Sequence, residues 1–204
     1  MASILKVDTI QDQSGNNIIN ESGDTITIGA SGDTVNIVGT LQNNGNNAVG
    51  ITMADQWRLT ASTNTGTNAD VTTNWERVDT DGWGGIGTGL TESSGIFSFP
   101  TTGIYLINFV ARMGVASSEN SANLILYTTL NNSTYDIASY ATCGNPDASN
   151  SVTCSGGNHQ LFDVTDITTH KFKFVTSSFN VGTVLTGNTS DTRTGFTCIR
   201  LGDT

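Results

Sequence analysis

Positive charge is scarce in this sequence of 204 residues. Eight Lys and Arg side chains stand against eighteen Asp and Glu, which gives a formal net charge of −10 and a pI near 4.2. Binding to phosphate backbones requires a cluster of cations that releases counterions, and attraction to anionic lipid also requires basic segments. The charge balance therefore argues against a nucleic-acid partner and against an anionic membrane surface.

Long apolar runs are also missing. The longest, Ile104 to Ala111, is interrupted by Asn108 and is far shorter than the ~20 residues that cross a bilayer. The opening residues, Met1 to Asp8, lack the apolar core of a signal peptide. We therefore expect no membrane insertion, and a protein that stays in the cell or leaves it without a signal, for example by lysis.

The residue patterns of known catalytic sites are absent. The two histidines, His159 and His170, have no Cys, His or Asp partner at metal-ligand spacing, and no G-x-S-x-G nucleophile elbow occurs. A glycosidase needs two carboxyls roughly 5 to 10 Å apart in a cleft, whereas Asp163 and Asp166 stand beside a turn that we expect them to cap. The sequence therefore predicts a protein that is not an enzyme.

Cofactor motifs are missing as well. Asp147, Asp191 and nearby Asn side chains offer oxygen donors for calcium, but the D-x-[DN]-x-[DN]-G spacing of a calcium loop does not occur. We expect no cofactor and leave calcium open as an alternative.

Cysteine is rare, with three residues and no C-x-x-C motif, which disfavours zinc and redox catalysis. Cys143 and Cys154 flank one loop, and a disulfide between them would contribute ~2 to 3 kcal/mol if it formed without strain. Assembly in the cytoplasm favours thiols, whereas life outside the cell permits later oxidation, so both states stay open. Cys198 alternates with Phe196 on the last expected strand, which predicts a buried thiol.

Short uncharged polar residues fill the sequence instead. Thr, Asn and Ser are abundant, and there are 23 Gly but only 2 Pro. Thr favours half-buried strands, while Asn, Ser and Gly favour turns, and the residues that favour helices are few. This composition predicts an all-β protein of an extracellular or particle-borne kind.

A repeat occupies part of the first fifty residues. Gly23-Asp24-Thr25-Ile26-Thr27-Ile28 recurs as Gly32-Asp33-Thr34-Val35-Asn36-Ile37, and each copy predicts a turn followed by a short strand. The apolar side chains that share a face are Ile26, Ile28, Val35 and Ile37. Two or three units are too few for a solenoid, so we expect intertwined chains, most plausibly three, in a thin β stem. Ordinary hairpin strands of the main domain are the alternative.

A turn-rich break at residues 43–47 separates this stem, residues 1–50, from a larger β domain, residues 51–204. Gly, Asn and Ser clusters separate about nine short apolar segments in that domain, which is typical of a sandwich or jelly roll. The expected strands are 51–59, 75–78, 95–99, 104–113, 122–130, 135–140, 160–164, 170–176 and 195–201.

The segment that begins at Ile104 predicts how the domain associates. One face of this strand is apolar throughout and suits a sandwich interior: Tyr105, Ile107, Phe109 and Ala111. The other face, with Ile104, Leu106, Asn108, Val110 and Arg112, is also largely apolar, although a solvated face should be polar. We therefore expect a second copy of the chain to cover this face, with Leu106, Asn108 and Val110 in the interface.

Two motifs resemble a known family. Residues 95–109, G-I-F-S-F-P-T-T-G-I-Y-L-I-N-F, closely resemble the G-x-F-x-x-P-x-x-G-x-Y-x-x-x-F stretch of the C1q-like and TNF-like jelly rolls. Residues 194–201 are similar to the closing strand of that family. The resemblance covers residues 51–204 and implies a ten-strand jelly roll that forms a homotrimer through the sheet containing the strand at Ile104.

The beginning of the chain carries a second resemblance. Residues 2–10, with the Gly-Asp-Thr repeats, are similar to openings common among structural proteins of marine tailed phages, of the cyanophage type. The resemblance implies a virion protein that is assembled in the host cytoplasm and released by lysis. Its N-terminal segment would attach to other structural proteins of the virion.

The family topology implies three loops at the apex of the head, 114–121, 142–158 and 181–193. Long loops on a rigid scaffold are where binding residues usually lie. The candidate receptor-binding residues are Glu119, Asn120, Asn145, Asp147, Asn188, Asp191 and Arg193. Trp75 and Trp83 are further candidates for stacking on a sugar ring, although Trp more often anchors a core or an interface.

The function expected from these observations is that of a trimeric phage fibre or appendage protein. Its N-terminus would anchor it to the particle, and its head would bind a host-surface glycan or protein. Two alternatives stay open. One is a capsid, tail or baseplate decoration without receptor contact, and the other is a bacterial surface protein with the same type of head.

Overall fold

The protein is built of β-strands and falls into two compact units, residues 1–50 and 51–204. The computed structural model describes residues 9–11, 13–15, 17–22, 25–29, 31–39, 41–43, 46–47, 50–80, 82–117 and 119–204. Strands, turns and bends make up these residues, which confirms the all-β class for this part of the chain. None of them belongs to a helix long and apolar enough to cross a membrane.

The first unit consists of two small sheets. The strands β1 (Thr9–Gln11), β2 (Asn17–Ser22) and β3 (Thr25–Ile28) pair antiparallel in that order. Two further strands, β4 (Gln42–Asn43) and β5 (Asn46–Asn47), pair with each other on either side of residues 44 and 45. No side chain that the structure describes in residues 9–50 is buried, so this unit has no core of its own among them.

The two Gly-Asp-Thr repeats differ in structure. The first copy ends in β3, but residues 34–37 of the second copy form no strand in the single chain, so the strand expected there within an intertwined stem stays a prediction. Gly32 has a φ of 96°, which suits the expected turn, while Gly23 and Asp24 lie outside the described residues. A strand needs a hydrogen-bonded neighbour, and residues 34–37 pair with no strand among the described residues.

The second unit, which we call the head, contains two antiparallel sheets. One has the order β13-β10-β16-β6-β7, with β15 beside β10. Its strands are β6 (Met53–Leu59), β7 (Trp75–Arg77), β10 (Gly103–Val115), β13 (Val152–Val164), β15 (Val184–Leu185) and β16 (Gly195–Gly202). The other has the order β12-β11-β14-β9-β8. Its strands are β8 (Thr91–Ser93), β9 (Ile96–Ser98), β11 (Glu119–Thr129), β12 (Asp136–Asn145) and β14 (Lys171–Ser177).

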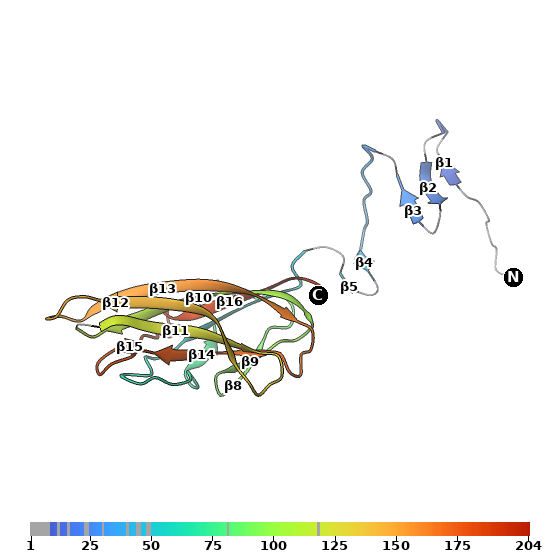
Figure 1. Cartoon of the computed structure of the whole chain (residues 1–204). Coiled ribbons are helices and arrows are strands. Elements are labelled where there is room, and N and C mark those ends of the chain that lie inside the picture. The colour runs from blue at the N-terminus through green and yellow to red at the C-terminus, as the bar shows by residue number, and fades with distance from the viewer. Residues whose placement is uncertain are drawn as a thin grey trace. The chain divides into compact units, whose positions relative to one another are not determined.

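The chain crosses repeatedly between the two layers, which Figure 1 shows one above the other. It passes from β9 to β10, back to β11, and from β12 to β13 and back to β14. This nesting of Greek keys is the topology of a jelly roll. The first and last strands of the head pair with each other, with Met53 opposite Arg200, so both ends of the head's chain lie at one end of the sandwich.

The core lies between the two sheets and is rich in aromatic rings. Alternate residues of β10, from Tyr105 to Met113, are at most 2% exposed, which confirms the interior face expected for this strand. Phe97 of β9 stacks on Phe172 of β14 at 5.0 Å and meets the edge of Phe196 of β16 at 4.7 Å. Rings from both layers therefore interlock, and such pairs contribute ~0.5 to 1.5 kcal/mol each beyond the area they bury.

All nine strands expected for the head are present, and the structure adds two short ones, β8 and β15. The main difference concerns β12 and β13, which extend to Asn145 and from Val152, through residues that were expected to form a loop. Their Ser, Asn and Gly content is typical of turns. Pairing with β10 nevertheless keeps β13 extended, because Val115 lies opposite Val152 at its far end.

Candidate functional site

Three loops meet at the end of the head opposite its chain ends. They include residues 116–117, 146–151 and 178–183, and the register of the strands and hydrogen bonds between the loops bring them together. Val115 and Val152 end β10 and β13 side by side, and Leu185 of β15 lies opposite Met113. The first two loops are shorter than the sequence predicts, because the long strands β10, β12 and β13 absorb much of the expected loop residues. In the third expected loop, 181–193, the short strand β15 divides the chain, and the residues between β15 and β16 hold Asn188, Asp191 and Arg193.

Glu119 does not face a receptor, so its assignment as a surface residue is wrong. It is 2% exposed, and its carboxylate accepts hydrogen bonds from the backbone N–H of Asn180, at 3.1 Å, and from the hydroxyl of Thr183. The Thr183 hydroxyl in turn accepts a hydrogen bond from Ala116 N at 3.0 Å. Glu119 therefore ties two loops together, and sequence polarity could not reveal that its side chain points inward.

Asn145 is a second correction, because it is fully buried. Its Nδ2 donates to the carbonyls of Ala116, at 3.0 Å, and Asn150, at 2.7 Å, while its Oδ1 accepts from Asp147 N at 2.9 Å. The side chain satisfies backbone groups that the short loops would otherwise leave without partners. Asn145 is thus a structural residue of this end of the head.

The other five candidates remain accessible. Asn120, Asp147 and Asp191 are exposed, whereas Asn188 and Arg193 are half-buried. Arg193 donates to Asp191 at 3.1 Å, and a surface ion pair of this kind contributes at most ~1 kcal/mol. Receptor contact by these residues remains a prediction.

Asp147 holds its own loop in shape. Its carboxylate accepts from the backbone N–H of Ser149 at 2.7 Å and from Asn150 Nδ2 at 3.1 Å. These hydrogen bonds, with Ser149 the larger contributor, lower the pKa of the Asp147 carboxyl because they favour its charged form. Within the part of the chain that the structure describes, no three His, Cys, Asp or Glu side chains gather into a group that could hold a metal ion.

The cysteine pair lies next to this end of the head. Cys143 is buried on β12 and Cys154 half-buried on β13, and both are thiols in the structure. Burial, with the neighbouring Cys154 thiol, raises the pKa of the Cys143 thiol to about 12. The two side chains are therefore neighbours, while the disulfide between them remains a prediction. Cys198 is fully buried, as expected, and this burial raises the pKa of its thiol.

The outer face of the first sheet is apolar over several strands. The register places Leu106 of β10 between Leu161 of β13 and Ile199 of β16. Leu161 is 56% exposed and Val110 is 36% exposed, while Asn108 adds a polar group to the same face. This surface, which we call the β10 face, is the one that the sequence assigned to contact between copies.

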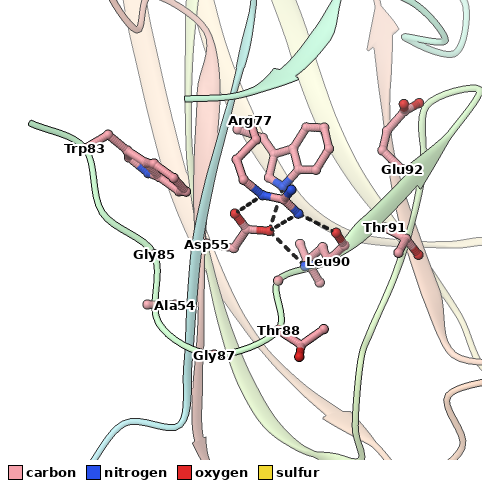
Figure 2. A pocket seen from close by; sticks show the side chains of 12 residues that line it. Ala54, Asp55, Arg77, Trp83, Gly85, Gly87, Thr88, Leu90, Thr91 and Glu92 are labelled. Carbon is pink, nitrogen blue, oxygen red and sulfur yellow. Dashed lines mark hydrogen bonds and ion pairs between the residues drawn. The ribbon is translucent and has the colours of Figure 1, made fainter. Parts of the chain in front are cut away.

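A pocket of about 650 Å³ opens at the opposite edge of the same sheet, beside β6 and β7. The segment 82–90 forms one wall, and β8 contributes Thr91 and Glu92. In Figure 2 the Trp83 indole lies on one side of Asp55 and Arg77, and Thr91 and Glu92 lie on the other. The lining residues are Ala54, Asp55, Trp57, Arg77, Trp83, Gly85, Gly87, Thr88, Gly89, Leu90, Thr91 and Glu92.

An ion pair between the buried Asp55 carboxylate and the Arg77 side chain, which is 41% exposed, forms the floor of the pocket. Asp55 is 3% exposed and accepts from Arg77 Nε at 2.8 Å, from Trp57 Nε1 at 2.9 Å and from Leu90 N at 2.8 Å. The guanidinium also lies over the Trp57 ring, 4.9 Å from its centroid. The hydrogen bond to Asp55 is the main cause that raises the pKa of Arg77, so this side chain stays charged.

Most of this pocket is not predicted by the sequence. Asp55 lies at an inward-facing position of β6, and Arg77 stands on the neighbouring strand β7. Alternation with Met53 and Trp57 places Asp55 on the inward face of β6. A buried charge is seldom left alone, so the need for a cationic partner could be read from the sequence, whereas Arg77 itself is exposed. Of the two aromatic candidates, Trp83 lines the pocket, whereas Trp75 packs into the core against Phe97.

Similarity to known proteins is confined to the fold. No profile of a protein family and no curated protein matches the sequence. Among solved structures, a crystal structure of murine APRIL at pH 8.5 shares 12% identity over 73% of this chain and 98% of that one, with a TM-score of 0.53. The structure of Eiger TNF from S. frugiperda shares 11% identity over 76% and 95% of the two chains, with a TM-score of 0.55. The C1q/TNF-like jelly roll expected for the head is thus confirmed as a fold, and a shared fold does not imply a shared function.

Proposed function

We propose that this protein is a non-enzymatic, homotrimeric fibre or appendage protein of a tailed-phage virion. In this proposal residues 1–50 attach the chain to other virion proteins, and the head contacts the surface of the host cell, through a glycan or a protein. The observation that carries the proposal is the β10 face, because it leaves an apolar surface that a second copy would remove from water.

The apolar residues of the β10 face favour self-association. Leu106, Leu161 and Ile199 are neighbours on one face, and an exposed contiguous apolar patch is typical of an interaction site. Burying apolar area contributes ~25 cal/mol per Å², so three such faces packed together would stabilise the heads. The TNF-type fold adds an expectation of trimers, which comes from the sequence resemblance.

The N-terminal unit supports the same proposal independently. Val38 is 93% exposed and Ile26 is 68% exposed, and the described residues of this unit bury no side chain that could form a core. A segment of this kind gains a core only from neighbouring chains. Residues 34–37, which pair with no strand in the described part of this unit, would pair with a second copy in an intertwined stem.

A light-scattering measurement on the head, residues 51–204, which has its own core, tests the trimer. We expect a particle of three chains for the unaltered head and of one chain for Leu161→Asp, because a charge would then have to be buried in the interface. Leu130→Asp is the matched control, since Leu130 is 63% exposed and outside the β10 face. A monomeric unaltered head, or a trimer that survives Leu161→Asp, would contradict the proposed interface.

An adsorption assay tests the role in host contact. Excess full-length protein is expected to block adsorption of the particle that carries it, and three identical weak sites would make the block stronger through avidity. If the protein leaves adsorption unchanged, the alternative of a capsid or tail decoration without receptor contact is favoured. An origin on a bacterial surface would be indicated if no particle contains the chain.

A further inference from the structure

The pocket beside β6 is separate from the loops and from the β10 face. Asp55 at its floor lies opposite Cys198, away from the end where the loops meet, and β16 separates β6 from β10. We propose that this pocket binds a neutral pyranose sugar, with the sugar ring against the Trp83 indole and its hydroxyls held by Arg77 and Glu92. The site does not depend on the loops, so it and the proposed host contact can fail independently.

The Trp83 ring is available for stacking. Trp57 and Trp75 each use their indole N–H, in bonds to Asp55 and to the Val71 carbonyl, and both pack on core rings. Trp83 is half-buried, and within the described chain no hydrogen bond or aromatic contact holds its indole. Its ring lies against Gly85, where a Cβ would come within 3.1 Å of it. An indole presented in this way offers a flat apolar surface with a polar edge.

Polar groups that the fold leaves unused line the same pocket. Arg77 commits Nε and Nη2 to Asp55 and to the Leu90 carbonyl, whereas its Nη1 has no hydrogen-bond partner among the described residues. Glu92 uses Oε1 to accept from Gly95 N at 2.6 Å, and its Oε2 likewise has no described partner. A sugar hydroxyl both donates and accepts, so adjacent hydroxyls match a guanidinium donor and a carboxylate acceptor.

The charges of the pocket select a neutral ligand. Asp55 and Arg77 neutralise each other, which leaves Glu92 as the uncompensated charge in a chain of net charge −10. An anionic sugar would be repelled by both. Asp55 is a poor ligand for a cation, because the two oxygens of its carboxylate already accept five hydrogen bonds.

The shape of the wall depends on glycine at two positions. A Cβ at Gly89 would lie 2.4 Å from an Asp55 oxygen, and one at Gly87 would lie 2.1 Å from the Thr52 carbonyl. Gly87 also has a φ of 64°, in the left-handed region. These residues let the 82–90 segment approach β6 closely, which fixes the wall that carries Trp83 relative to the ion pair.

Titration of the full-length protein with D-glucose, D-galactose and D-mannose tests the site, with D-glucuronate and D-galacturonate as charged counterparts. We expect at least one neutral sugar to bind saturably in calorimetry, with a Kd on the order of 1 mM or weaker, and its acid to bind at least about fivefold more weakly. Calorimetry is preferred to fluorescence because one variant removes a fluorophore.

Two variants assign the binding to the pocket. Trp83→Ala is expected to weaken binding about tenfold or more without lowering the melting temperature, because the ring is outside the core. Glu92→Gln keeps an acceptor for the Gly95 N–H. It should weaken binding of the neutral sugar and reduce the ratio between the affinity for the neutral sugar and the affinity for its acid. Val181→Ala, at a side chain 93% exposed elsewhere on the head, is the control and should change nothing.

The proposal is overturned if none of the three neutral sugars binds at roughly 50 mM, if Trp83→Ala binds as tightly as the unaltered protein, or if the acids bind more tightly than the neutral sugars. Sugar binding without any block of adsorption would support the pocket and contradict the proposed host contact. A block of adsorption without sugar binding would contradict the sugar site in the pocket and support the proposed host contact.

Discussion

At the scale of single residues, the direction of a polar side chain decides its role. Glu119 and Asp147 are both acidic residues near the same end of the head, but Glu119 is buried and joins two loops, while Asp147 is exposed and shapes its own loop. A carboxylate that accepts several N–H and O–H groups inside a protein replaces the water that those groups would bind in the unfolded chain.

Replacing Glu119 with Ala should therefore destabilise the head. The Thr183 hydroxyl and the Asn180 N–H would lose their buried acceptor, at a cost of ~1 to 3 kcal/mol for each group left unsatisfied. Urea unfolding should show this loss, whereas Asn120→Ala, at the exposed neighbouring residue, should stay within ~0.5 kcal/mol. Equal stability of the two variants would mean that Glu119 does not tie the loops.

At the scale of elements, strand pairing extends what local composition predicts. Residues 142–145 and 152–158 resemble a loop in sequence, yet they continue β12 and β13, and the two strands approach each other where the sheets meet. Asn158 Nδ2 donates to the Tyr140 carbonyl at 3.1 Å across this approach. Glycine is required there, because a Cβ at Gly156 would lie 2.8 Å from the Thr142 carbonyl oxygen.

Gly156→Ala should force β12 and β13 apart and cost ~1 to 3 kcal/mol, the usual range for overpacking. Gly202→Ala is the matched control, since Gly202 also lies in a strand and a Cβ there would meet no atom within 4 Å. Thermal unfolding of both variants measures the difference. If Gly156→Ala melts no earlier than Gly202→Ala, the two strands do not constrain each other at this point.

At the scale of the whole molecule, apolar association and acidic charge oppose each other. Each chain carries a formal net charge of −10, so copies that pack through the β10 face also bring like charges together. Salt shortens the screening distance from ~10 Å at 0.1 M to ~3 Å at 1 M, while burial of apolar area is not screened.

Self-association of the full-length protein should therefore strengthen with salt. We expect sedimentation equilibrium to give a smaller dissociation constant at high than at low sodium chloride concentration, because repulsion weakens. Association that weakens as salt rises would indicate that ion pairs, not apolar contact, hold the copies together.

The sequence by itself determined the class, the position of nearly every strand of the head and the interior face of β10, because alternation of apolar residues and turn residues is local information. It also placed the jelly roll through the motif at residues 95–109, whose Phe97 and Tyr105 proved fully buried. Only the tertiary structure decided which polar residues face solvent. Glu119 and Asn145 point inward because partners from distant loops meet them there, and no local pattern records such meetings. The pocket beside β6 belongs to the same category, since β6, β7, the 82–90 segment and β8 become its walls only when the sandwich closes.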